Sequence, residues 1–465
     1  MGDRTISDAY AEWIASLEFE SIPQSVVIDV RHRVLDNLGI QIAALSLPST
    51  QAVIEAIGAW GGTPESSVPG LDVMVPAPSA ALAAGLMGHS FDYDDTHFPT
   101  MMHTHAVIIS AALAAGQAES RPGRDLVVAI VAGIETALRV ALADPVGFQV
   151  SGLQPSSFVG IFGAAAAASR AKGLNAQRTR NALGIAGNQA SGLLQSVVDG
   201  SDGKLFNCGW AAHGGVVAAD LAARGLTAPA EIFEGQFGVY PVHLNPGQWE
   251  TQDAIHDLGQ VWHTPDVAFK LHSGCQHTHS FIDAIFELKQ TNALEADIIH
   301  AIDCQVINEQ VPVICEPMAT KLEPETPYAA RFSLPYIVAA ALVLDDMGPH
   351  AYSEERLSDA RIRGLARRVR YTSHADPGFP GRLPAYLTIT LNDGRKLTAS
   401  RENCRGAADD PIQDKDIEAK FRGNCKGILE DKQISALIET CSRLEDLSKA
   451  EVLLSLADLN THTGS

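Results

Sequence analysis

The densest group of ionisable side chains in the sequence lies between residues 89 and 105. It reads HSFDYDDTH and continues after a proline as MMHTH, so that three carboxylates and four imidazoles fall within seventeen residues. If His89–Asp95 is a helix end, His89, Asp92 and Asp95 lie three residues apart and close to one helical face. Burying such groups is costly unless each has a partner, which favours a functional interpretation.

Three interpretations of this segment remain open. Asp and His side chains at these spacings could bind a divalent metal, with His89, Asp92, Asp95 and His97 as ligands of a hydrolase. Alternatively, the carboxylates orient imidazoles for acid/base chemistry without a metal. The third possibility is a capped helix end with solvated charges. Because the later HTH segment has no carboxylate close by in the sequence, we expect no metal.

A second group of reactive residue types spans Lys270–His279, KLHSGCQHTH. A glycine-containing loop that runs into a helix N-terminus presents backbone N–H groups, and Lys270 adds a positive charge. The segment therefore predicts an anion site, although its histidines could equally be structural.

Two further segments carry cations. Lys204 follows glycines in DGSDGKLFNCGWAAHGG, and a partly desolvated lysine loses pKa toward the range of a proton acceptor. A surface lysine on a flexible loop is the alternative. Arg331, in RFSLPY, could bind a carboxylate through two N–H groups.

These residues together predict chemistry on a small di- or tricarboxylate. The sequence has no G-x-G-x-x-G or P-loop pattern, and we expect no cofactor. A His or Lys would remove a proton beside a carboxylate, and cations would stabilise the negative charge that develops.

The elements that must position these residues change character along the chain. Up to about residue 262 the apolar residues recur at helical spacing, and the small-residue segments Gly160–Ser169 and Gly184–Gly192 predict closely packed helices. After Lys270 the pattern is α+β, and the helical period returns at the C-terminus. The expected strands are 298–306, 368–372, 385–391 and 396–400, and the expected helices are 328–344, 354–367 and several within 414–459.

We therefore expect a large all-α helical domain plus a smaller α+β domain inserted before the C-terminal helices. The predicted ranges are 1–267 with 410–465 for the helical domain and 268–409 for the α+β domain.

Composition excludes several classes of protein. The 465 residues are 46% hydrophobic with mean hydropathy +0.04, which excludes disorder. The 55 acidic residues against 34 basic ones give a net charge of −21, so nucleic acid and anionic membranes are not expected partners. Seven cysteines without a C-x-x-C pair, and no apolar run of the roughly 18 residues that a span needs, predict a cytoplasmic protein.

Several motifs, in order along the whole chain, resemble the MmgE/PrpD family. They are FDYDDTH with HTH, SSFVGIFGAAAAAS, K-x-x-x-x-G-W-A-A-H-G, DVAFK with C-x-x-T-H-S-x-I-D-A, and RFSLPY. The resemblance implies a helical domain plus an α+β domain, a homodimer, an active site between the domains and no cofactor. Known activities of the family are 2-methylcitrate dehydratase, cis-aconitate decarboxylase and iminodisuccinate epimerase, so the fold does not select the reaction.

The resemblance places Asp92, Thr96, His103, Lys204 and Lys270 in the cleft. Cis-aconitate decarboxylases carry a histidine where this chain has Gln154, and another where we align Cys275. A decarboxylase or dehydratase needs acids that these replacements lack, whereas an epimerase only moves a proton between two faces. The sequence hypothesis is therefore a cofactor-independent epimerase of iminodisuccinate.

In this hypothesis Lys204 and His103 are the acid/base pair, and Asp92 orients an imidazole or the Thr96 hydroxyl. The alternatives are a dehydratase of 2-methylcitrate type, a cis-aconitate decarboxylase, and a noncatalytic carboxylate-binding protein. The residues expected to bind substrate are Thr96, Gln154, Lys270, Cys275, His277 and Arg331.

Overall fold

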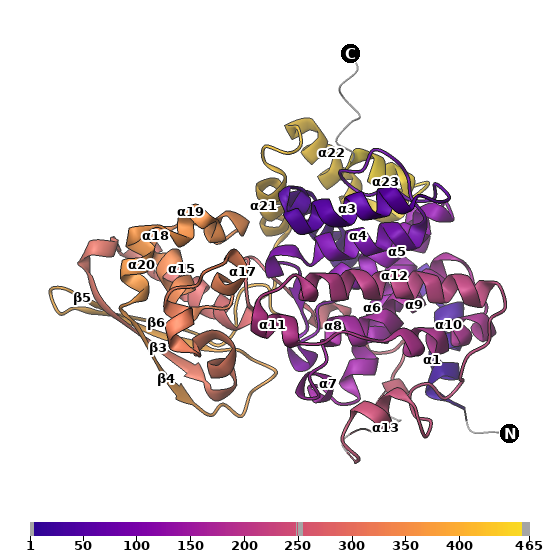
Figure 1. The fold of residues 1–465 in the computed structure, drawn as a ribbon, viewed down its shortest axis with the longest axis horizontal. Coiled ribbons are helices and arrows are strands. Elements are labelled where there is room, and N and C mark those ends of the chain that lie inside the picture. Colours follow the sequence, from indigo (N-terminus) through magenta and orange to yellow (C-terminus); the bar gives the residue numbers. More distant parts are fainter. Residues whose placement is uncertain (1–3, 248, 250–253, 458–465) are drawn as a thin grey trace. The chain divides into compact units, whose positions relative to one another are not determined.

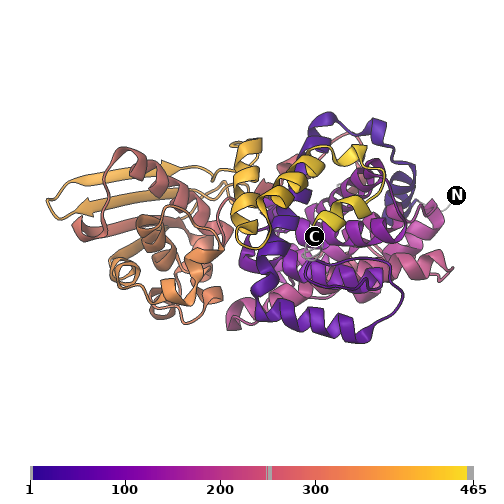
Figure 2. The ribbon, with the colours of Figure 1, turned by 90° about the horizontal axis from the view of Figure 1, so that it is seen from above.

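The computed structural model describes residues 4–247, 249 and 254–457. By its internal contacts the chain divides into two compact units, which Figures 1 and 2 show in colours that follow the sequence. Unit 1 comprises residues 1–90, 94–267 and 417–465, and unit 2 comprises residues 91–93 and 268–416. Unit 1 is helical and unit 2 is the smaller, α+β unit, which confirms the predicted fold class.

Unit 1 is built from helices that pack through small residues. A Cβ added to Gly163 of α9 would lie 2.7 Å from the carbonyl oxygen of Gly133 on α6. A Cβ on Gly209 of α12 would lie 2.5 Å from the carbonyl oxygen of Leu82 on α4. Because these positions admit no side chain, the helix axes approach closely. The elements are α1 (Ile6–Ser16), α2 (Gln24–Ala43), α3 (Pro48–Trp60), α4 (Ala77–Gly88), β1 (Asp95–Thr96), α5 (His105–Ala118), α6 (Gly123–Leu142), α7 (Gly147–Val150), α8 (Pro155–Phe158), α9 (Gly160–Ala171), α10 (Ala176–Gln189), α11 (Gln195–Asp199), α12 (Gly203–Ala223), α13 (Val239–His243), α21 (Asp414–Cys425), α22 (Asp431–Ser442) and α23 (Glu451–Leu456).

The chain leaves helical geometry at the first ionisable cluster. Helix α4 ends at Gly88, and His89 is its C-cap. Phe91 and Asp92 then adopt left-handed backbone conformations, with φ of 68° and 50°. The expectation that His89, Asp92 and Asp95 share one helical face is therefore wrong, because the helix stops before all three.

Unit 2 contains a four-stranded sheet in the order β4-β3-β5-β6. Strand β3 pairs parallel to β4 and antiparallel to β5, and β5 pairs antiparallel to β6. Every second residue of β5 is buried, which is the alternation expected of a sheet with one covered face. Helices α15 and α18 pack on this sheet. The elements are β2 (Ala268–Phe269), α15 (His279–Thr291), β3 (Ile299–Ile307), α16 (Met318–Leu322), α17 (Pro327–Ala330), α18 (Leu334–Val343), α19 (Glu354–Leu357), α20 (Ala360–Ala366), β4 (Val369–His374), β5 (Ala385–Leu391) and β6 (Lys396–Arg401).

Within the described residues, no single helix has both the length and the hydropathy that crossing a bilayer requires. Helices α2 and α3 with their connecting turn meet that test only as a pair, and they are bent by 94° at the break.

Candidate functional site

Asp95 organises the first cluster, in unit 1. One carboxylate oxygen accepts backbone N–H groups of Thr104 at 2.8 Å and His105 at 3.2 Å, and the other accepts the Thr104 hydroxyl. Asp95 therefore satisfies N–H groups at the start of α5. Burial, together with the neighbouring Asp94 carboxylate, raises the pKa of Asp95 to about 7.

His103 is held beside Asp95 through the backbone. Its N–H donates to the Ser156 hydroxyl at 2.9 Å, and its ring Nδ1 contacts the carbonyl oxygen of Asp95. The Thr96 hydroxyl donates to the same carbonyl oxygen at 2.7 Å. A carbonyl can only accept, so Nδ1 carries the proton and Nε2 carries the lone pair. With its side chain 12% exposed, His103 presents an imidazole in a single tautomer.

A second imidazole lies next to His103. His89 Nδ1 donates to the Asp94 carboxylate at 2.8 Å, and the His89 and His103 ring centroids are 5.0 Å apart. Asp94 also lies 3.8 Å from His103 Nδ1. The first cluster thus contains two oriented imidazoles and two carboxylates, all buried except the partly exposed His103 ring.

A buried ionic network that the sequence did not indicate supports this cluster. Arg33 of α2 lies 2.8 Å from His105 Nε2 and 3.8 Å from the Asp95 carboxylate. On the other side of the same ring, Asp36 pairs with Lys420 of α21 at 2.6 Å. Burial raises the pKa of Asp36 to about 6, although Lys420 opposes the shift. Sequence reasoning missed Arg33, Asp36 and Lys420 because they are distant in sequence and belong to no local motif.

Lys204 and Gln154 also belong to unit 1. Lys204 is buried, 6% exposed, and lies in the first turn of α12 rather than in the expected glycine-rich loop. The Gln154 amide donates to the Lys204 carbonyl oxygen at 3.5 Å and accepts from Asn207 at 2.8 Å. Gln154 therefore fixes the start of α12, and its neighbour Ser156 binds the His103 backbone.

The second cluster belongs to unit 2 and includes Asp92. Lys270, which is fully buried, places its ammonium 3.0 Å from both the carboxylate and the carbonyl oxygen of Asp92. The Gly274 N–H donates to the same carbonyl at 3.1 Å, and the Ser273 hydroxyl donates to the Phe91 carbonyl at 2.8 Å. These contacts hold Phe91 and Asp92 in their left-handed conformations, and such strained backbone is common at functional sites.

The remaining predicted residues of unit 2 surround this pair. The Cys275 N–H donates to the Arg331 carbonyl at 2.9 Å, and the Arg331 Nε–H donates to the Ser273 hydroxyl at 3.3 Å. Burial lowers the pKa of His277 to about 4, so its ring is neutral at pH 7. Sequence reasoning missed Tyr352, whose hydroxyl donates to the Ser273 carbonyl at 2.6 Å.

Asp94, Asp95 and His103 have ligand atoms within 4.8 Å of one another, a spacing that a metal ion could use. Asp95, however, already accepts two N–H groups and a hydroxyl, and His103 Nδ1 contacts a carbonyl. The hydrolase ligand set considered from the sequence is also differently engaged, since His97 binds Thr100 at 2.8 Å. The donor atoms fit a hydrogen-bonded acid/base cluster better than a metal centre.

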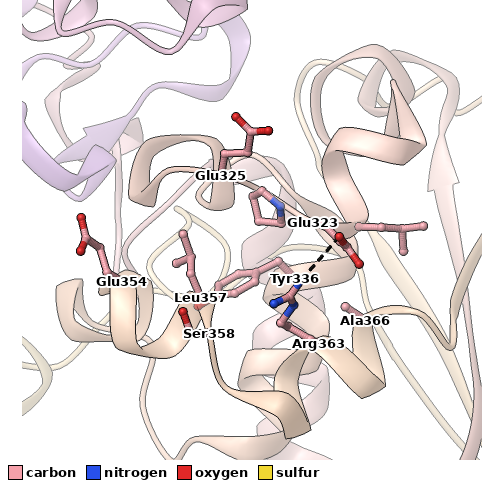
Figure 3. Close-up of a pocket in the computed structure, with 10 residues that line it drawn as sticks. Glu323, Glu325, Tyr336, Glu354, Leu357, Ser358, Arg363 and Ala366 are labelled. Atoms are coloured by element: carbon pink, nitrogen blue, oxygen red, sulfur yellow. Dashed lines mark ion pairs between the residues drawn. The ribbon is translucent and has the colours of Figure 1, made fainter.

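A separate cavity of about 410 Å³ lies in unit 2. Figure 3 shows Glu323, Glu325 and Glu354 around it, with Arg363 paired to Glu323 at 3.4 Å. Its lining contains none of the predicted site residues, and the excess of carboxylates would repel an anionic substrate.

Comparison with known proteins identifies the family. The model of the MmgE/PrpD N-terminal domain matches residues 8–252, and that of the C-terminal domain matches residues 272–444. The chain belongs to the MmgE/PrpD family. The resemblance found in the sequence motifs is thereby confirmed.

Relatives of this MmgE/PrpD protein match over almost their whole length. Human cis-aconitate decarboxylase is 27% identical over 97% of this chain and 94% of its own. A cis-aconitate decarboxylase-like protein of Aspergillus oryzae is 26% identical over 96% and 95%. The cis-aconitate decarboxylase of Aspergillus terreus is 23% identical over 97% and 96%. Two of these relatives are thus named as decarboxylases, and the third is named as decarboxylase-like.

Proposed function

We propose that this MmgE/PrpD protein is a cofactor-independent lyase of small polycarboxylates, with decarboxylation of a cis-aconitate-like tricarboxylate as its reaction. The observation that carries the proposal is the match to cis-aconitate decarboxylases across 96–97% of the chain. The buried groups of both units add support, because they supply imidazoles and cations without a nucleotide-binding motif. The lyase thus replaces the epimerase as the leading hypothesis.

Decarboxylation needs a proton donor rather than a strong base. When the bond to one carboxylate breaks, its electron pair stays on the adjacent carbon, CO₂ leaves, and a proton must bind that carbon. His103 can carry this proton on Nε2, because the Asp95 carbonyl accepts from Nδ1 and so stabilises the imidazolium. Lys204 is the second candidate donor. Cations that bind the remaining carboxylates would stabilise the carbanion before protonation.

An epimerase remains the second candidate, and Gln154 and Cys275 favour it. The Gln154 amide, bound by Asn207, cannot supply a proton where cis-aconitate decarboxylases carry a histidine. An epimerase would use His103 and Lys204 to remove a proton from one face of a carbon and return it to the other face.

One experiment separates these reactions. The protein is incubated in deuterated water with cis-aconitate, 2-methylcitrate or stereopure iminodisuccinate, and each reaction is followed by proton NMR, polarimetry and trapping of released CO₂. Release of CO₂ from cis-aconitate, with one deuterium in the product, is the expected result. Deuterium exchange with loss of optical rotation in iminodisuccinate would instead establish the epimerase, and a new C=C bond from 2-methylcitrate the dehydratase.

Two controls complete this experiment. Activity that survives exhaustive chelation would exclude the metal-dependent alternative. Binding of all three compounds without conversion of any would contradict the lyase and indicate a carboxylate-binding protein.

A further inference from the structure

Arg331 carries a buried positive charge that forms no ion pair with an acidic residue of the described chain, although the charge of the Asp92 carboxylate acts on it. Its side chain is 8% exposed, and its Cζ lies 5.3 Å from the Phe91 ring centroid and 5.0 Å from that of Tyr352. Among the described residues, its side chain makes one hydrogen bond, from Nε to the Ser273 hydroxyl. Across residues 4–247, 249 and 254–457, no carboxylate lies within 4.0 Å of its guanidinium, and the two Nη groups donate to no protein acceptor. A buried charge of this kind is costly without a partner.

His277 is a second buried group with unused hydrogen-bonding capacity. Its side chain is 9% exposed, and its Nδ1 has no hydrogen-bond partner among the described residues. The charges of Asp92 and Lys270 both act on its ring. Because buried polar groups are normally paired, two such side chains around Asp92 indicate a ligand that completes them.

Lys270 differs from Arg331 in this respect. Its ammonium donates to the carboxylate and the carbonyl of Asp92, both at 3.0 Å, so that its charge is compensated within the protein. Of these two cations of unit 2, Arg331 is therefore the one without a direct ion pair among the described residues, although the sequence predicts the same substrate-binding role for both.

We propose that Arg331 binds one carboxylate of the substrate through its two Nη groups and so selects polycarboxylates, whereas Lys270 is a positioning residue that holds Asp92. This inference rests on the proposed function and specifies its substrate class. The planar guanidinium offers two parallel N–H donors that match a carboxylate, and the hydrogen bond from Nε to Ser273 fixes its orientation. Because Lys270 pairs with the Asp92 carboxylate, that carboxylate does not form an ion pair with Arg331 in place of the substrate.

The test measures binding of propane-1,2,3-tricarboxylate, an unreactive probe, to the full chain by isothermal titration calorimetry. Arg331→Gln, which retains an amide for Ser273, should weaken binding by about 100-fold, the loss expected for charged hydrogen bonds. Arg331→Lys keeps the positive charge but lacks the two parallel N–H donors, and its affinity for the probe should fall about 10-fold. Arg395→Gln, on the exposed β5–β6 turn of the same unit, should bind as the wild type does. Equal binding by Arg331→Gln, or no binding by the wild type, would overturn the proposal.

A double variant tests the role of Lys270. Lys270→Met alone should weaken probe binding, because it leaves the Asp92 carboxylate uncompensated. Lys270→Met combined with Asp92→Asn should restore binding to within about threefold of wild type, since the removed charges cancel. If the double variant binds as poorly as the single one, Lys270 itself contacts the substrate. Circular dichroism confirms that each variant is folded.

The binding assay and the turnover assay fail independently. Arg331-dependent binding without turnover of any polycarboxylate would reject the proposed lyase but keep this inference. Turnover with an unchanged kcat/KM in Arg331→Gln would reject this inference but keep the proposed lyase.

Discussion

A single backbone carbonyl determines the chemical state of the proposed acid/base histidine. The Asp95 carbonyl accepts hydrogen bonds from His103 Nδ1 and from the Thr96 hydroxyl. The Asp95 carboxylate accepts backbone N–H groups at the start of α5. The side chain of Asp95 thus fixes the position of its own carbonyl, and the carbonyl fixes the tautomer of His103. Because the proton of the neutral ring is on Nδ1, Nε2 is the nitrogen that would gain or lose a proton in the proposed reaction.

Replacing the proposed proton donors tests this assignment. His103→Gln should lower kcat by roughly 100- to 10,000-fold, the usual contribution of a general acid or base, and Lys204→Met should do the same if it donates to the carbon. His256→Gln, at an exposed histidine of unit 1, is the matched control and should leave kcat unchanged. A His103→Gln variant with near wild-type kcat would show that the proton comes from another group.

The sequence identified the residue types of both clusters but not their partners. Dense polar motifs contain His103, Lys204, Lys270 and Arg331. Burying such polar groups is costly unless each has a partner, and this cost marked the motifs as candidate sites. The buried ionic network that supports the first cluster joins α2 to α21, almost four hundred residues later in the chain. No local sequence pattern encodes an ion pair between such distant helices. The positions predicted to bind substrate stay predictions, but the structure shows that the Lys270 and Gln154 side chains already bind protein groups.

At the scale of elements, α2 and α21 form one support for the first cluster. A Cβ added to Gly39 of α2 would lie 2.8 Å from the Phe421 ring, which shows how closely the two helices pack. The Lys420–Asp36 pair lies at the same contact and is almost completely excluded from water. Because Asp36 is also 3.7 Å from His105 Nδ1, the C-terminal helices contribute to the position of α5.

Breaking this ion pair should destabilise unit 1. Lys420→Met leaves a buried carboxylate without its cation, which typically costs about 3 to 5 kcal/mol in the free energy of unfolding. Adding Asp36→Asn should recover most of that loss, and Lys415→Met, at an exposed position of α21, should change little. Denaturant titration measures all four proteins. A Lys420→Met variant with the same free energy of unfolding as the wild type would mean that the Lys420–Asp36 ion pair contributes no net stability.

The strands were predictable from the sequence because their pattern is local. Strand β5 has the predicted bounds, and the Asn392–Gly394 turn places Gly394 at φ 86°, as a tight hairpin requires. The helix expected over 328–344 is interrupted instead, because Ser333 caps α18 and Pro335 occupies its first turn. Those two residues are a recognisable start signal, whereas the left-handed Phe91 and Asp92 depend on contacts from residues 270–274.

At the scale of the whole molecule, the two units have separate cores that contain all seven cysteines. Each of these cysteines is buried, and none of them forms a disulfide. Burial raises the pKa of Cys315, Cys425 and Cys441 to about 12, so little thiolate is present at neutral pH. Alkylation of these thiols therefore reports opening of the unit that contains each one.

Alkylation with iodoacetamide, read by peptide mass spectrometry, should consequently give two groups of rates. Cys304, Cys315 and Cys404 of unit 2 should react together, and Cys208, Cys425 and Cys441 of unit 1 should react together at a different rate. Propane-1,2,3-tricarboxylate at ten times its dissociation constant should slow the unit 2 group by about tenfold, because bound ligand must leave before that unit opens. In Arg331→Gln this protection should vanish at the same probe concentration. One common rate for all six thiols would instead show that the chain opens as a single cooperative body. Protection that persists in the variant would show that the carboxylate binds elsewhere.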